Sequence, residues 1–151
     1  EASGGERSDR VTEVLRIEEE AGLHRVDGYL QLRPRTEAVR HDLLRFLLDC
    51  HAEGKRVVGY GAPGKGNTLL NYCGIRTDFL DFTVDANTYK QGKFTPGTRI
   101  PIHSPARIRD ARPDYVLILP WNLQEEISRA AAYIGEWGGR FVVPIPEVQI
   151  L

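Results

Sequence analysis

The stretch that decides the fold is VVGYGAPGKGNTLL, residues 57–70, in which an apolar run leads into a glycine-rich turn. Gly59, Gly61 and Gly64 have the spacing G-x-G-x-x-G, which is typical of the turn between the first strand and the first helix of a dinucleotide-binding fold. Such a turn exposes backbone N–H groups at a helix N-terminus, where the helix dipole favours an anion. The stretch therefore predicts an anion-binding strand–turn–helix unit.

Three residues distinguish this turn from the common nucleotide-binding loops. Pro63 has no N–H and removes one donor from the loop. Lys65 stands where a Walker A loop has its lysine, but Gly66 replaces the Ser or Thr that would bind Mg²⁺. Two interpretations remain open from the residues alone: a loop that binds an anion, or glycines that only let helix and strand pack closely.

Outside this unit, short apolar runs alternate with helical patterns, which predicts an α/β fold with a doubly wound, mostly parallel Rossmann-like sheet of about five strands. We expect the strand order 3-2-1-4-5, with ligands at the carboxyl ends of the strands. The predicted strands are residues 56–60, 79–84, 99–102, 115–119 and 140–145. The predicted helices are two N-terminal ones, 10–21 and 36–53, then 66–72, a short helix opened by Ser104-Pro105, and 122–137.

The last of these helices carries the clearest pattern. Asn122 is predicted to cap it, with Glu125 three residues later. Its buried stripe is predicted to consist of Leu123, Ile127, Ala130 and Ile134.

Length and composition limit the possible functions. The 151 residues suit one domain, and we expect residues 1–9 to be disordered and residues 10–151 to form that domain. With 20 basic and 21 acidic residues the chain lacks the positive field of a nucleic-acid-binding protein, so no nucleic acid is expected as a partner. No apolar run is long enough to cross a membrane, so no membrane is expected as a partner either. Cys50 and Cys73 fall in helical patterns as core residues, which agrees with a cytoplasmic location.

Four motifs carry a more specific signal. They are GYGAPGKGNTLLNYCGI (59–75), TVDANTYKQGKFTPGTRIPI (83–102), PDYVLILPWN (113–122) and GGRFVVPIP (138–146). In this order they resemble the C-terminal domain of the sugar C-methyltransferase family, whose members methylate nucleotide-linked keto-deoxysugars with S-adenosylmethionine. One departure is Ala86-Asn87-Thr88, where the family usually has Arg-Asn-Pro, so a phosphate or carboxylate partner of that arginine is in doubt.

The resemblance implies a domain that works as part of a longer chain. The family has a zinc-binding N-terminal domain and a central S-adenosylmethionine-binding domain, and its C-terminal domain closes over the nucleotide-sugar. We therefore expect no cofactor, metal or catalytic residue in this chain, with zinc and S-adenosylmethionine bound upstream. On this basis the chain binds a nucleoside diphosphate sugar, packs against the central domain of the same polypeptide and is inactive by itself.

The groups expected to bind substrate lie in the glycine-rich turn and after the second and fourth predicted strands. They are Gly61, Ala62, Pro63, Gly64, Lys65, Gly66, Asn67, Asp85, Lys90, Trp121 and Asn122. Several have a plainer alternative: Lys90 as a solvated loop charge, Asn122 as a helix cap, and Trp121 as an anchor for the neighbouring domain. Asp85 either ends its strand or binds a ribose, and the ribose role fits a rival function, an autonomous NAD(P)-binding oxidoreductase domain.

Overall fold

The computed structural model describes residues 8–151, and the chain divides after Ala38 into two compact units. The first unit contains α1 (Asp9–Glu20), α2 (Val26–Leu30) and the first turns of α3 (Leu32–Ala52). None of the residues of α1 and α2 is buried. Of the nine residues expected to be disordered, 1–7 lie outside the described residues, and Asp9 is the first residue of α1.

The predicted helix 10–21 is confirmed, and α3 begins four residues before the predicted start at Thr36. Pro34 is compatible with this earlier start because the N–H groups of the first helical turn have no partner within the helix. The five-residue helix α2 was not predicted, since it is too short to show a period.

The second unit is built on a six-stranded sheet in the order β3-β2-β1-β4-β5-β6. Its strands are β1 (Val57–Tyr60), β2 (Thr83–Val84), β3 (Ile102–His103), β4 (Tyr115–Ile118), β5 (Arg140–Val143) and β6 (Gln149–Ile150). Neighbours among the first five pair in parallel, whereas β6 is antiparallel to β5. The predicted α/β class and the order 3-2-1-4-5 are confirmed, and β6 is an addition that its two exposed residues did not reveal.

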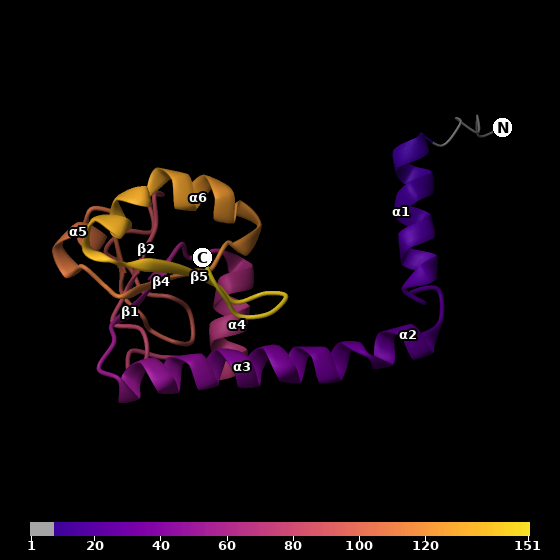
Figure 1. Ribbon diagram of the computed structural model, residues 1–151, viewed down its shortest axis with the longest axis horizontal. Helices are drawn as coiled ribbons and strands as arrows, with labels where there is room; N and C mark the ends of the chain where they lie inside the picture. The colour runs from indigo at the N-terminus through magenta and orange to yellow at the C-terminus, as the bar shows by residue number, and fades with distance from the viewer. Residues whose placement is uncertain (1–7) are drawn as a thin grey trace. The chain divides into compact units, whose positions relative to one another are not determined.

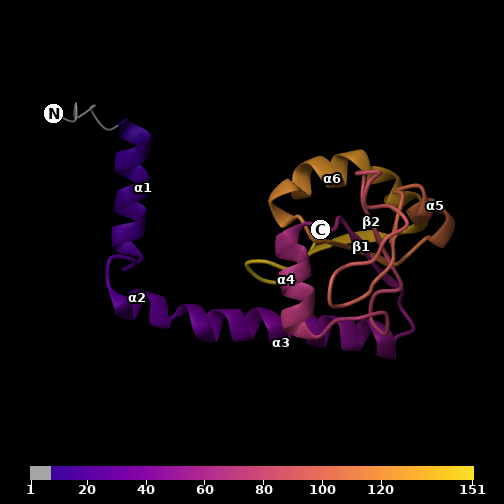
Figure 2. The same cartoon turned by 180° about the vertical axis from the view of Figure 1, so that it is seen from behind.

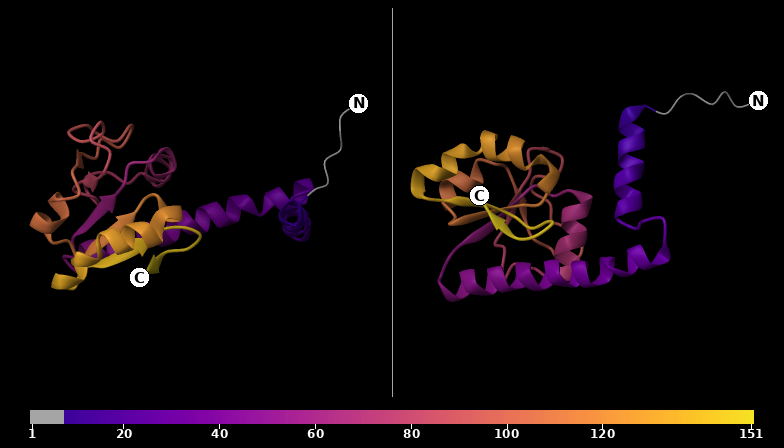
Figure 3. Two further views of the ribbon diagram at one scale, coloured as in Figure 1. Left: turned by 90° about the horizontal axis from the view of Figure 1, so that it is seen from above. Right: turned by 45° about the vertical axis from the view of Figure 1, so that its right-hand side comes forward.

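Helices cover both faces of this sheet (Figures 1 and 2). The part of α3 in this unit and α4 (Gly64–Cys73) lie on one face, and α5 (Arg107–Ala111) and α6 (Gln124–Ala130) lie on the other. Successive strand residues alternate between the two cores, so Val57 faces α3 and α4 while Val58 faces α5 and α6. Figure 3 shows the same layers from above and after a turn about the vertical axis.

Two predicted strands are shorter in the structure than in the sequence pattern. In the segment 79–84 only Thr83 and Val84 pair, because Phe79 and Leu80 form a turn whose N–H groups bond to the carbonyl of Arg76. In the segment 99–102 only Ile102 belongs to β3. A buried apolar residue is thus not always a strand residue, even in a run of them.

The prediction for the helix 122–137 is wrong in two respects. The segment is divided into η1 (Trp121–Leu123), α6 and η2 (Ala132–Trp137), where η denotes a 3-10 helix. Asn122 lies inside η1 and caps no helix. The change in helical period at Ala131 buries that residue in place of Ala130, and Leu123 is exposed as well.

Cys50 and Cys73 are buried and unpaired, as predicted for core residues. Among the helices of residues 8–151, none has the length and apolar character needed to cross a membrane.

The two thiols provide a test of this core. Burial raises the pKa of both Cys50 and Cys73 to about 11, so at pH 8 only roughly one thiol in a thousand is the reactive thiolate. We expect both cysteines to react with a thiol reagent such as DTNB far more slowly in the folded protein than in urea. Fast labelling of the folded protein at a rate close to the unfolded one would contradict the packing described here.

Candidate functional site

The candidate site lies at the carboxyl edge of the parallel sheet. The last residue of β1, Tyr60, stands level with Val84 of β2 and Ile118 of β4, so the segments that follow all three strands leave the sheet at the same edge. In the sheet, β2 and β3 lie on one side of β1, whereas β4 and β5 lie on its other side. The loops after β1 and β4 therefore flank the point where ligands bind in open α/β sheets.

The glycines of the turn have different roles, which the sequence spacing did not separate. Gly61 has a φ of +85° and packs so closely that an added Cβ would lie 2.6 Å from the Cδ of Pro120. At Gly66 an added Cβ would lie 2.8 Å from the Cβ of Leu119, whereas at Gly64 it would meet no atom within 4 Å. The glycine that lets α4 approach the sheet is therefore Gly66, and Gly64 leaves open space at the start of the helix.

Fewer loop amides are free than the sequence suggested. The N–H of Gly61 bonds to the carbonyl of Val84, and that of Ala62 donates to the Asp85 carboxylate at 2.8 Å. Pro63 precedes the helix and its carbonyl accepts the N–H of Asn67. Pro63 therefore removes no donor from the helix start, and the expected donor set is corrected to the first-turn amides.

Those amides belong to Gly64, Lys65 and Gly66, for which residues 8–151 offer no backbone acceptor. The side-chain oxygen of Asn67 is buried in the same turn and likewise has no partner among the described residues. Free N–H groups at the positive end of a helix favour an anionic ligand.

Asp85 and Lys90 hold the turn in place. The Asp85 carboxylate accepts hydrogen bonds from the Lys90 ammonium at 2.8 Å, from the N–H of Ala62 and from the N–H of Asn87. Lys90 also donates to the carbonyl of Ala62 at 3.1 Å. Lys90 is thus not a free loop charge, because Asp85 and Ala62 accept two of the three hydrogen bonds that its ammonium can donate.

The pKa of Asp85 reflects these contacts. Burial of the side chain, which is 12% exposed, raises its pKa, but the hydrogen bonds from Lys90, Asn87 and Ala62 outweigh burial, so the pKa is lowered. Most acceptor positions of this carboxylate are occupied by the protein itself, which leaves little capacity for the hydroxyls of a ribose.

Lys65, Trp121 and Asn122 form a second group at the same edge. The Lys65 ammonium donates a hydrogen bond to the side-chain oxygen of Asn122 and lies 4.4 Å from the centre of the Trp121 ring. The Lys65 charge has no acidic partner among the described residues. The structure thus brings together three predicted site residues from two elements, α4 and η1.

One residue of the site was not predicted. The buried hydroxyl of Thr83 donates to the carbonyl of Gly61 at 2.8 Å. It reaches this position because Gly59, on the neighbouring strand, has no side chain: a Cβ there would lie 2.7 Å from the Thr83 oxygen. The only signal in the sequence was a threonine near the end of a mostly apolar predicted strand.

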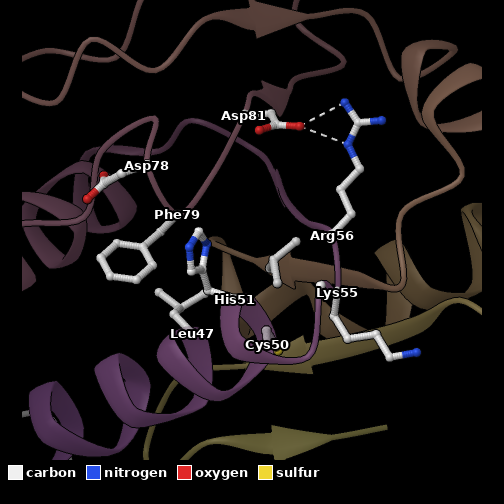
Figure 4. Close-up of a pocket in the computed structure, with 10 residues that line it drawn as sticks. Leu47, Cys50, His51, Lys55, Arg56, Asp78, Phe79 and Asp81 are labelled. Carbon is white, nitrogen blue, oxygen red and sulfur yellow. Dashed lines mark hydrogen bonds and ion pairs between the residues drawn. The ribbon is translucent and has the colours of Figure 1, made fainter.

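A second hollow lies at the opposite, amino end of the strands (Figure 4). Leu47, Cys50 and Phe79 line it together with Arg56. The cations there are already paired: Arg56 with Asp81 at 2.7 Å, as Figure 4 shows, and Lys55 with Asp114 at 3.2 Å. Because these positive charges are already paired, this end of the sheet is a poorer binding site for an anion than the carboxyl edge.

Comparison with known proteins decides the family. A family described as "C-methyltransferase C-terminal domain" matches residues 1–146. The chain belongs to this family. It is also 41% identical over 141 residues to the C-methyltransferase NovU of Streptomyces niveus, a match that covers 93% of this chain and 34% of that protein. The chain thus spans about a third of the length of this relative.

Among solved structures, a UDP-D-quinovosamine 4-dehydrogenase from Vibrio fischeri is similar with a TM-score of 0.47 and 18% identity, over 64% of this chain and 93% of that one. It adds nothing to the functional argument. The resemblance to C-methyltransferases expected from the four sequence motifs is confirmed.

The roles of the glycines in this C-methyltransferase domain can be separated by mutation. We expect Gly66→Ala to lower the free energy of unfolding by about 1–3 kcal/mol, because the new methyl group would collide with Leu119. Gly64→Ala is the matched control and should leave stability unchanged or slightly higher, since its Cβ meets nothing. Urea denaturation measures both. Equal losses of stability for the two substitutions would show that the contact between α4 and Leu119 does not require glycine at position 66.

The contribution of Asp85 has a defined pH dependence. Because its folded pKa is lowered, its stabilisation is present above the unfolded pKa of about 3.9 and is lost as the pH falls through the folded value. We expect Asp85→Asn to destabilise the protein by about 1–3 kcal/mol at pH 7 and by progressively less as the pH falls below about 3.9. Asp78→Asn, at an exposed position, is the control and should have little effect. A loss for Asp85→Asn that does not change with pH would contradict the ion pair with Lys90.

Proposed function

We propose that this domain binds a nucleoside diphosphate sugar at the carboxyl edge of its sheet and presents it to the rest of a C-methyltransferase. The observation that carries the proposal is the start of α4, where three amides have no acceptor among residues 8–151 and where Lys65 extends its ammonium to Asn122 and Trp121 after β4. A diphosphate brings about two negative charges to this point, and both the helix dipole and the lysine favour them.

The other groups of the site fit substrate binding better than catalysis. Methylation of a carbon beside a keto group requires a base to remove a carbon-bound proton, donors for the enolate oxygen and a methyl sulfonium in line with the carbanion. The carboxylate of Asp85 is occupied by Lys90 and Ala62, so it is not available as that base. We propose that base and methyl donor come from the other part of the enzyme and that this chain alone transfers no methyl group.

An autonomous NAD(P)-binding oxidoreductase is the alternative function. It requires an acidic residue at the end of the second strand to bind the ribose hydroxyls. Asp85 has that place in the chain, but its carboxylate accepts hydrogen bonds from Ala62, Asn87 and Lys90 and so stabilises the turn. The geometry therefore favours substrate binding in a methyltransferase.

The first unit supports a further proposal, that this chain packs against a neighbouring part of the enzyme. Its helices leave large apolar side chains exposed, including Val26 at 77% and Leu30 at 63%. The others are Val11, Val14, Leu15, Ile17, Tyr29 and Leu32. An apolar helix face of this kind is typical of a surface that another protein part covers. We propose that the methyltransferase portion of the same polypeptide is that part.

Substitution of Lys65 tests the binding site. We expect Lys65→Ala to weaken binding of a thymidine diphosphate sugar by about 1–3 kcal/mol, and the loss to shrink as salt screens the charge. Calorimetric titration of the purified chain at two ionic strengths measures this. In a complete enzyme the same change should mainly raise KM, because phosphate contacts far from the reacting carbon hold substrate and transition state about equally.

The control for this experiment is Lys93→Ala, which removes the same charge from an exposed loop position. Equal, small effects of Lys65→Ala and Lys93→Ala would reduce the role of Lys65 to a general charge effect. Micromolar binding of S-adenosylmethionine by this chain would contradict the proposal that the methyl donor binds to the other part of the enzyme.

A further inference from the structure

A pocket of about 430 Å³ lies within the first unit, between α1 and α2. Its walls are Leu15, Glu18, Glu19, Leu23, His24 and Tyr29. The turn that joins the two helices is closely packed, since a Cβ added at Gly28 would lie 2.1 Å from the carbonyl oxygen of Gly22. The N–H of Leu23 also bonds to the carbonyl of Glu18 at 2.9 Å. The backbone of this unit therefore holds the walls of the pocket together.

The apolar face of α1 has a carboxylate in the middle of it. Val11, Val14, Leu15 and Glu18 recur at intervals of three and four residues, so their side chains project from one face of the helix. The three apolar side chains are between 41% and 53% exposed, and Glu18 is exposed as well. The face for which we proposed a cover thus includes a negative charge.

This charge stands at the unfavourable end of the helix. Glu18, Glu19 and Glu20 are the last residues of α1, and the last turn contains no basic residue. A negative charge at the C-terminal end of a helix opposes the helix dipole, at a cost of about 0.3–1 kcal/mol for each group. Glu20 recovers part of this cost through its ion pair with Arg16.

Glu18 and Glu19 have no such compensation. Within residues 8–151, neither of these carboxylates accepts a side-chain hydrogen bond or forms an ion pair. Arg25 follows the pocket residue His24, but its guanidinium donates to Nε2 of His24 at 2.9 Å. The first unit therefore keeps two unbalanced negative charges on one pocket.

A cover over this face must bring a positive charge. A carboxylate that is buried without a partner is strongly unfavourable, so buried charges in proteins are paired. The pocket has the groups that bind a long basic side chain. The carboxylates of Glu18 and Glu19 can accept its hydrogen bonds, Leu15 and Leu23 can cover its methylene groups, and the ring of Tyr29 can face its charge.

We propose that the methyltransferase portion of the polypeptide inserts a lysine or arginine side chain into this pocket, where Glu18 and Glu19 pair with its charge. The inference rests on the proposed packing of the first unit and adds the chemistry of the partner surface. The match to the C-methyltransferase NovU covers 34% of that relative, so about two thirds of its length lies outside the match and is large enough to supply such a surface. A basic anchor also fixes the alignment of the two parts, because any other alignment leaves the carboxylates unpaired.

Hydrogen exchange of the α1 amides measures whether the face is covered. The exchange rates are compared between this chain alone and a complete enzyme in which the chain is joined to its methyltransferase portion. No residue of α1 is buried in the chain alone. We therefore expect α1 to exchange at least about tenfold more slowly in the complete enzyme.

Glu18→Gln and Glu13→Gln are the matched pair of variants. Both neutralise a glutamate of α1, but only Glu18 lines the pocket. In the complete enzyme Glu18→Gln should speed the exchange of α1 about tenfold, whereas Glu13→Gln should change it little. In the chain alone Glu18→Gln should instead slow the exchange slightly, because it removes a negative charge from the C-terminal end of the helix. This reversal of sign is not expected if Glu18 acts only within α1.

Leu15→Ala distinguishes failure of this inference from failure of the proposed packing, with Leu48→Ala, at an exposed position of α3, as its control. If Leu15→Ala speeds the exchange of α1 in the complete enzyme and Glu18→Gln does not, the packing stands and the basic anchor is wrong. If α1 exchanges equally fast in the chain and in the complete enzyme, the proposed packing fails and this inference fails with it. Slowing of the exchange in the chain alone as its concentration rises, to the rate of the complete enzyme, would assign the face to a second copy and overturn the proposal.

Discussion

The close approach of α4 to the end of β4 is the constraint on which the rest of the site depends. A side chain at Gly66 would collide with Leu119, so only glycine lets the helix begin directly at the sheet edge. Because the helix begins there, its free amides point to the place where the loops of β1 and β4 separate. A helix set further from the sheet would leave Lys65 out of reach of Asn122.

A second set of contacts fixes the turn that precedes the helix. Asp85 and Lys90 bond to both backbone groups of Ala62, and Thr83 bonds to the carbonyl of Gly61. These groups belong to the protein's internal structure even though they lie beside the proposed ligand site. Preorganisation of this kind lets a phosphate bind without ordering the loop first, and the cost of ordering is a main reason why flexible sites bind weakly.

The same geometry divides the carboxyl edge into two regions with different chemistry. One is polar and cationic, with the amides of α4 and the charge of Lys65. The other is a mainly apolar pocket beside α6, lined by Tyr60, Leu123, Glu126, Ile127 and Ala130 among others. Phosphates are held by charge without much selectivity, whereas an enclosed apolar pocket discriminates by shape and by the few polar groups in it.

The sequence by itself determined the α/β class, the strand order, the core cysteines and the family, because each rests on local periodicity or on long motifs read in order. It did not determine which of the glycines packs, which amides are free or whether Lys90 has a partner. Those properties depend on atoms far apart in the chain: Gly66 on Leu119, Ala62 on Asp85, and Lys65 on Asn122. The stripe of Leu123 and Ala130 shows the same limit, since periodicity identifies an apolar face but only the tertiary structure decides what that face meets.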